Sequence, residues 1–138
     1  MTHYVLDACA LLAMLKGENG AKEVDNLFQQ AVRGNALLSM SIINLLEVCY
    51  GFIKDIGFTE TQDMMKKINH TPLVIIDTIS QRVYDEAARL KGIYHRISLA
   101  DAVGVATAIE LSGVFVTADH HELETVASKE KLNFFWFR

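Results

Sequence analysis

Apolar residues recur along the chain in two alternating arrangements, short continuous runs and stripes repeating every three to four residues. The runs are typical of strands buried on both faces, and the stripes are typical of helices with one buried side. Strands alternating with helices predict an α/β fold. We expect a three-layer α/β/α sandwich in which helices cover both faces of a central, mostly parallel sheet.

The predicted strands are His3–Leu6, Ala36–Ser39, Leu73–Ile76, Val114–Thr117 and Phe134–Phe137. The predicted helices are Ala8–Leu15, Ala21–Val32, Ser41–Lys54, Thr59–Asn69, Ser80–Tyr94, Ile97–Leu111 and His120–Ser128. Within this scheme Thr59 is expected to cap its helix, and Val32 to lie on the buried stripe of its own. No repeat or linker interrupts the series, so residues 1–138 are predicted to form one domain.

Composition narrows the class of protein. A length of 138 residues with 51% hydrophobic content suits one globular domain with a sizeable core. The net charge of −4 argues against coating nucleic acid by bulk electrostatics, but it is compatible with an enzyme acting on nucleic acid through an acidic, metal-charged pocket. Cys9 and Cys49 lack metal-type spacing and are expected to be buried free thiols. With neither a signal-like start nor a membrane span, we expect a cytoplasmic protein.

The helix predicted at Ile97–Leu111 is small or apolar on every side, yet it carries the carboxylate of Asp101. Such a pattern is typical of a helix buried all round, and burying an unpaired carboxylate costs free energy. Asp101 therefore needs a partner, either an ordinary hydrogen-bond donor or a metal ion shared with other acids.

Three further acids occupy related places. Asp7 and Asp119 end predicted strands, and Glu47 lies inside the helix that follows the second strand. Ligands of open parallel sheets bind beyond the carboxyl ends of the strands, so all four acids can reach one pocket. Their carboxylates would repel one another without a counter-charge, and Mg²⁺ or Mn²⁺ takes oxygen ligands of this kind. The pattern therefore predicts metal-assisted hydrolysis of a phosphodiester.

Each acid also has a purely structural explanation. Asp7 can cap the helix that follows it, and Ser98-Leu-Ala-Asp101 resembles a capping box. Asp119-His-His-Glu122 resembles another, so Glu122 is expected to belong chiefly to a cap, with a peripheral place among the acids as its alternative. Glu47 lies too far inside its helix to cap, and its alternative is a buried ion pair.

Four segments resemble, in order and spacing, the acidic motifs of PIN-domain nucleases: Tyr4-Val-Leu-Asp7, Asn44-Leu-Leu-Glu47-Val, Ser98-Leu-Ala-Asp101-Ala and Val116-Thr-Ala-Asp119. The resemblance covers essentially the whole chain and is greatest to the VapC toxins of type II toxin–antitoxin modules. It implies a Mg²⁺- or Mn²⁺-dependent endoribonuclease that is usually dimeric, acts on RNA and is inhibited by a cognate VapB antitoxin. A PIN nuclease with a housekeeping role in RNA processing is the nearest alternative.

The same resemblance assigns a role to each acid. Asp7 and Asp101 would be the principal metal ligands, and Asp119 would complete the pocket. Glu47 would ligate the metal or orient its water. Thr117 matches a frequent hydroxyl position, where it would hydrogen-bond a carboxylate, or it is simply a β-branched strand residue.

Four other residues have side chains suited to a functional role: Arg96, His120, His121 and Asp77. Arg96 precedes the Asp101 helix and is a candidate contact for RNA phosphate, or else a solvated cation at a helix end. His120 and His121 begin a helix, are expected to be solvated and are not placed in the site. Leu73-Val-Ile-Ile-Asp77 is similar to the phospho-acceptor strand of a receiver, a signalling module. The other receiver acids and the late lysine are missing, so Asp77 is expected to be a turn residue or a helix cap.

Overall fold

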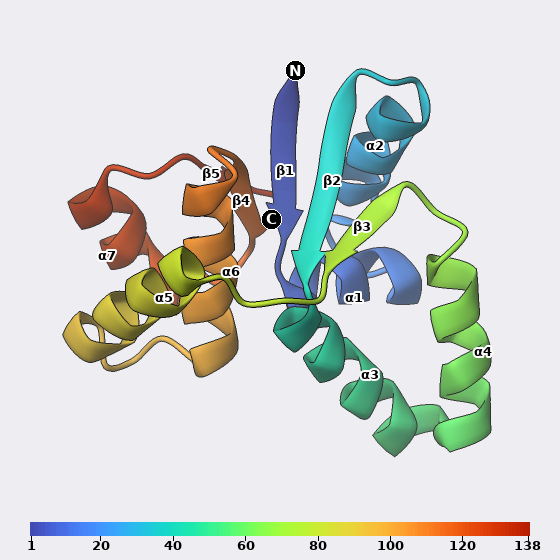
Figure 1. Cartoon of the computed structure of the whole chain (residues 1–138). Helices are drawn as coiled ribbons and strands as arrows, with labels where there is room; N and C mark the ends of the chain where they lie inside the picture. Colours follow the sequence, from blue (N-terminus) through green and yellow to red (C-terminus); the bar gives the residue numbers. More distant parts are fainter.

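The computed structural model describes all residues, 1–138, and contains a five-stranded sheet in the order β3-β2-β1-β4-β5 (Figure 1). The strands are β1 (Thr2–Leu6), β2 (Ala36–Ser41), β3 (Leu73–Ile76), β4 (Val114–Thr117) and β5 (Phe134–Trp136). Every pair of neighbouring strands is parallel. The predicted α/β class is therefore confirmed, and the sheet is parallel throughout.

Helices cover both faces of this sheet, as predicted for a three-layer sandwich. They are α1 (Ala8–Lys16), α2 (Ala21–Val32), α3 (Ile42–Ile56), α4 (Phe58–Ile68), α5 (Gln81–Ile93), α6 (Leu99–Glu110) and α7 (His120–Glu130). One layer contains α1, α2 and α4, and the other contains α5, α6 and α7 (Figure 1). Helix α3 lies beyond the arrowheads of β1 and β2, where it contacts both α1 and α6.

The apolar core has two halves, one on each face of the sheet. Successive residues of β1 point to opposite faces, so Leu6 joins the half beside α1 and α2, whereas Val5 joins the half beside α6. Both side chains are fully buried. A strand covered on both faces has no polar side, which explains the continuous apolar run in the sequence.

The strand order reverses between β1 and β4, which lie side by side with Tyr4 opposite Val114 and Leu6 opposite Val116. Open parallel sheets bind ligands at such a switch point, beyond the carboxyl ends of the strands. Asp7 follows β1 directly, and Asp119 follows β4 after one intervening residue. The topology therefore brings these two acids to one edge of the sheet.

Helix caps account for much of the local geometry at this edge. The side chain of Asp7 caps α1, that of Ser98 caps α6 and that of Asp119 caps α7. All three predicted caps are confirmed, and each fixes the first turn of a helix that borders the switch point.

Two details of the prediction were wrong. Helix α4 begins after Gly57, whose φ is +89°, and the hydroxyl of Thr61 donates to the Gly57 carbonyl oxygen at 2.7 Å, so Thr59 does not cap it. Val32 is 66% exposed because it is the last residue of α2 and lies beyond the covered part of the stripe.

Other expectations are met or refined. Asp77 is exposed in the loop after β3, and Ser80 rather than Asp77 caps α5. Cys9 and Cys49 are free thiols, each partly buried. No helix has both the length and the apolar character needed to cross a membrane.

Candidate active site

Asp7 is held rigidly at the end of β1. Its side chain is 3% exposed; Oδ1 accepts a hydrogen bond from the Ala10 backbone N–H at 2.8 Å, and Oδ2 accepts one from the Thr117 hydroxyl at 2.5 Å. Burial raises the pKa of Asp7 to about 6, although the bonds from Thr117 and Ala10 act in the opposite direction. The carboxylate is thus oriented by two donors and lacks a cationic partner.

Asp101 lies in the first turn of α6, where its backbone N–H donates to Ser98 Oγ at 3.0 Å. The residue is only 9% exposed. Burial and then the negative charges of Asp7 and Glu47 raise the pKa of Asp101 to about 7. Asp7, at the end of β1, and Glu47, on α3, are therefore close enough to Asp101 for their charges to act on its carboxyl group.

A tighter group of carboxylates forms beside Asp101. Oxygens of Asp101, Asp119 and Glu122 lie within 4.8 Å of one another. Glu122 was expected chiefly as part of a cap, and its backbone N–H does donate to Asp119 Oδ1 at 3.3 Å. Its side chain nevertheless joins the cluster, because residues three apart share one side of a helical turn. That spacing was the available signal that Glu122 could face the pocket.

Glu47 is half-buried on α3, and burial raises the pKa of its carboxylate. The alternative predicted for it was an ion pair with a lysine or arginine. None of the four ion pairs in the structure contains Glu47, nor do they contain Asp7, Asp101, Asp119 or Glu122. Five acids therefore converge without any compensating side-chain cation.

This donor set suits a hard divalent cation. Mg²⁺ and Mn²⁺ prefer oxygen ligands, and oxygens of Asp101, Asp119 and Glu122 come close together here, with Asp7 and Glu47 near enough to act on Asp101. A bound cation would also relieve the repulsion that raises the pKa of Asp101. Neither a thiolate nor an imidazole belongs to the cluster of three, which makes a zinc site a poorer fit.

Thr117 connects two of the acids. Its hydroxyl donates a hydrogen bond to Asp7 Oδ2. The hydroxyl oxygen, Thr117 Oγ1, in turn accepts a hydrogen bond from the backbone N–H of Asp119 at 3.1 Å. Thr117 is fully buried at the end of β4, so its β-branched shape suits the strand while its hydroxyl serves the site. Both readings of this residue from the sequence therefore hold.

The other candidates are not members of the acid cluster. Arg96 is exposed in the turn between α5 and α6 and makes no ion pair. Asp77 follows β3, which is separated from β1 by β2, so it does not join the cluster. His120 is exposed, as expected, but its ring is stacked on that of Trp136.

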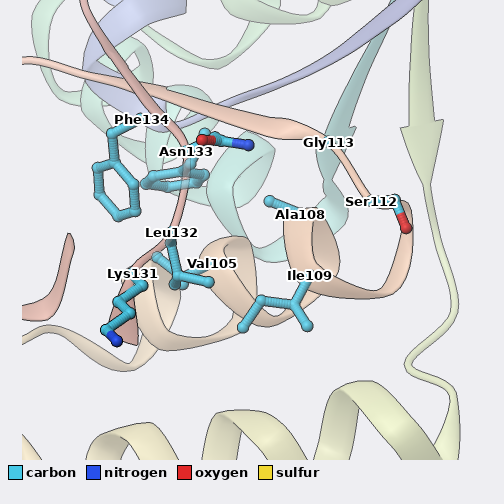
Figure 2. Close-up of a pocket in the computed structure, with 10 residues that line it drawn as sticks. Val105, Ala108, Ile109, Ser112, Gly113, Lys131, Leu132, Asn133 and Phe134 are labelled. Atoms are coloured by element: carbon cyan, nitrogen blue, oxygen red, sulfur yellow. The ribbon is translucent and has the colours of Figure 1, made fainter. Parts of the chain in front are cut away.

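A pocket of about 250 Å³ lies at the opposite edge of the sheet (Figure 2). Ser112 and Gly113 precede β4, and Asn133 precedes β5, so the pocket borders the amino ends of these strands. It lies between the end of α6 and the segment before β5, and no acid lines it. It is therefore separate from the cluster of carboxylates.

Comparison with known proteins agrees with the acidic motifs. The PIN domain family matches residues 4–129, which include all five clustered acids. The chain belongs to the PIN domain family. No curated protein gave a significant match.

Solved structures share this PIN fold over nearly the full chain. VapBC2 from Rickettsia felis, solved on a DNA fragment from its promoter, has a TM-score of 0.74 at 21% identity and covers 97% of this chain and 98% of its own. VapBC-1 from nontypeable Haemophilus influenzae has a TM-score of 0.73 at 17% identity, covering 99% and 98%. A toxin–antitoxin complex from Klebsiella pneumoniae has a TM-score of 0.60 at 23% identity, covering 87% and 89%. At these identities the likeness establishes the fold.

Proposed function

We propose that this PIN domain is a Mg²⁺- or Mn²⁺-dependent endoribonuclease of the VapC type, the cytoplasmic toxin of a toxin–antitoxin pair. The observation that carries the proposal is the convergence of five unpaired carboxylates at the switch point of the sheet. Membership of the PIN family and the shared fold with toxin–antitoxin proteins support it.

Asp7 and Asp101 would be the principal ligands of the cation, with Asp119 and Glu122 completing the oxygen set. A divalent ion bound there would supply charge stabilisation for the phosphate and lower the pKa of a water. Glu47 faces Asp101 from α3 and would accept a proton from the attacking water or orient it. Burial raises the pKa of the Glu47 carboxylate, which is the direction that suits a proton acceptor.

Thr117 and the Ala10 N–H act by positioning. Their hydrogen bonds hold both oxygens of Asp7, so this ligand is oriented before a cation arrives. Preorganisation of this kind reduces the rearrangement needed to admit an RNA phosphate into a negatively charged pocket.

The experiment is cleavage of labelled single-stranded RNA by the purified protein. Cutting is expected with Mg²⁺ or Mn²⁺ and should stop in excess chelator or in the Asp101→Asn variant, which should remain folded by circular dichroism. Undiminished cutting in chelator would refute the metal-dependent mechanism. A short adjacent gene for a DNA-binding protein would favour the toxin role, and its absence would favour housekeeping RNA processing.

We propose that the antitoxin docks in a groove of about 420 Å³ between α1, α2 and α4. Its apolar lining includes Leu11, Met14, Leu15, Phe28 and Met64, and its charged lining residues are Glu60, Asp63 and Lys67, which leave a net negative charge. An apolar segment with basic flanks would match this surface. Met64→Lys should weaken capture of the antitoxin and leave RNA cleavage unchanged, because none of the five acids of the candidate active site lines this groove.

We propose that a second copy of the chain covers the apolar surface between α5 and α6. A depression of about 540 Å³ lies there, bordered by Ile79, Tyr84 and Leu99, whose exposed fractions are 46%, 63% and 63%. Contiguous apolar surface of this kind usually marks a protein interface. Light scattering should give a dimer for the wild type and Tyr84→Phe, and a monomer for Tyr84→Glu.

Arg96 remains a proposed contact for RNA phosphate. Its neutralisation to glutamine should flatten the salt dependence of RNA affinity by roughly one unit of slope. An unchanged slope would remove Arg96 from the substrate site.

A further inference from the structure

The ring of His120 is fixed in place beside the acidic pocket. It stacks on Trp136 with ring centroids 4.3 Å apart and an angle of 19° between the planes. Its Nε2–H donates to the Arg138 carbonyl oxygen at 2.8 Å. Its Nδ1 lies 3.4 Å from Glu124 Oε1, and one ring face is covered by Trp136, but the side chain is still 45% exposed.

Behind His120 stands a column of aromatic rings that leads into the core. Trp136 contacts Phe134 at 5.3 Å between centroids, and Phe134 contacts the buried Phe115 at 5.5 Å. A surface ring supported in this way cannot rotate freely. A planar ligand that stacks on it would therefore not have to order the His120 side chain, and less conformational entropy would be lost on binding.

The outer end of this column lies at the same edge of the sheet as the carboxylates. Trp136 is opposite Thr117 in the β4–β5 register, and the Phe137 backbone N–H donates to the Thr117 carbonyl oxygen at 3.2 Å. His120 directly follows Asp119, a member of the acid cluster. A molecule held on the His120 ring would therefore extend naturally towards the pocket.

Arg138 brings a positive charge to this edge. Its guanidinium donates to the Asn19 carbonyl oxygen at 2.8 Å and lies 5.3 Å from the centre of the Phe137 ring. No carboxylate pairs with it.

We propose that His120, Trp136 and Arg138, here called the His120 platform, bind single-stranded RNA, with a nucleobase stacked on the open face of His120 and a backbone phosphate at Arg138. This inference rests on the proposed ribonuclease function and adds a binding subsite to it. The platform combines a rigid aromatic face with an unpaired cation, which is how proteins hold single strands without reading their sequence.

The first test is steady-state cleavage of single-stranded RNA with Mg²⁺. His120→Ala should raise KM about tenfold with little change in kcat, because stacking binds the substrate without taking part in bond breaking. His120→Phe should restore most of the affinity, since it keeps the planar face. His121→Ala is the matched control, because the side chain of this neighbouring exposed histidine makes no hydrogen bond or ion pair, and the KM of this variant should equal that of the wild type.

The second test is binding without cleavage. Trp136 is the only tryptophan, so its fluorescence reports on the platform. In the Asp101→Asn background, random single-stranded RNA decamers should quench this emission, and His120→Ala should weaken the response. Arg138→Gln should lower the salt slope of binding by about one, whereas Arg33→Gln, before β2 at the far edge of the sheet, should leave it unchanged.

The outcomes separate the two proposals. If the wild-type protein cuts no RNA with any divalent ion, the proposed function fails, whatever the platform does. If the wild type cuts RNA while His120→Ala and Arg138→Gln keep its KM and salt slope, the platform proposal alone is overturned. Weakened capture of the antitoxin by these variants, with an unchanged KM, would likewise overturn it by assigning the surface to a protein partner.

Discussion

The hydroxyl of Thr117 donates to Asp7 Oδ2 at 2.5 Å, although 110 residues separate the two positions. The contact exists because β1 and β4 are neighbours at the switch point, with Leu6 paired to Val116. It ties the orientation of a proposed metal ligand to the pairing of two strands. The pairing of β1 with β4 therefore also orients the Asp7 carboxylate in the candidate site.

Replacing Thr117 by valine should impair the site more than the fold. The shape is kept, but Asp7 loses a donor that lowers its pKa, and the Asp119 N–H loses its acceptor. Loss of such a supporting contact typically costs tenfold to a hundredfold in metal affinity or activity. Titration with Mn²⁺ should show this loss, and Thr117→Ser should recover most of it. A valine variant with wild-type affinity would contradict the positioning role.

Stability without metal should fall as the pH rises. Asp101 has a folded-state pKa of about 7 against an ordinary 3.8, so between these values the folded protein holds a proton that the unfolded chain has released. The contribution of Asp101 to the free energy of unfolding is therefore most favourable below about pH 4 and becomes less favourable as the pH rises to about 7. Thermal melts in chelator should show the decline, and the Asp101→Asn variant should show less of it.

Adding Mg²⁺ at pH 8 should reverse this loss, because the cation binds the ionised carboxylates of the folded state only. The matched control is Asp77→Asn, which removes an exposed acid outside the cluster. Its melting profile should follow that of the wild type at every pH. A melting temperature of the wild-type protein that does not change with pH would show that ionisation of Asp101 does not destabilise the fold. The acids would then not repel one another appreciably.

Much of this site could be predicted from the sequence because its determinants are local. An acid directly after an apolar run marks a strand end, and Ser98 three residues before Asp101 marks a helix start. Parallel topology then places strand ends at one edge. This reasoning predicts from the sequence alone that Asp7 and Asp119 lie at that edge.

The remaining features depend on packing that local spacing does not encode. Glu122 satisfies a capping pattern whether or not its side chain reaches Asp101, so the sequence favoured the simpler role. The stacking of His120 on Trp136 requires the register of β5 against β4. Such contacts follow from the fold as a whole. The sequence correctly predicted that His120 is exposed to solvent, but it did not predict the stacking on Trp136.

Glu122→Gln should weaken binding of the divalent ion if its carboxylate completes the oxygen set. The change removes one negative charge and keeps the side-chain volume and the backbone bond to Asp119. Calorimetry with Mn²⁺ should show a several-fold loss of affinity. Glu23→Gln, on α2 in the other layer, removes the same charge away from the cluster and should bind as the wild type does. Equal affinities for both variants would return Glu122 to a purely capping role.

Gly104→Ala should lower both stability and activity, because Gly104 lies where the helices that carry Asp101 and Glu47 touch. A Cβ there would meet Asn44 Oδ1 at 2.7 Å and Phe115 Cε1 at 2.8 Å. Asn44 and Phe115 are both fully buried, so neither side chain can move away into solvent and the packing around Gly104 must shift. Overpacking of this kind costs about 1–3 kcal/mol in the free energy of unfolding, measurable with urea. Gly51→Ala, on α3 with nothing within 4 Å, should instead gain up to about 1 kcal/mol.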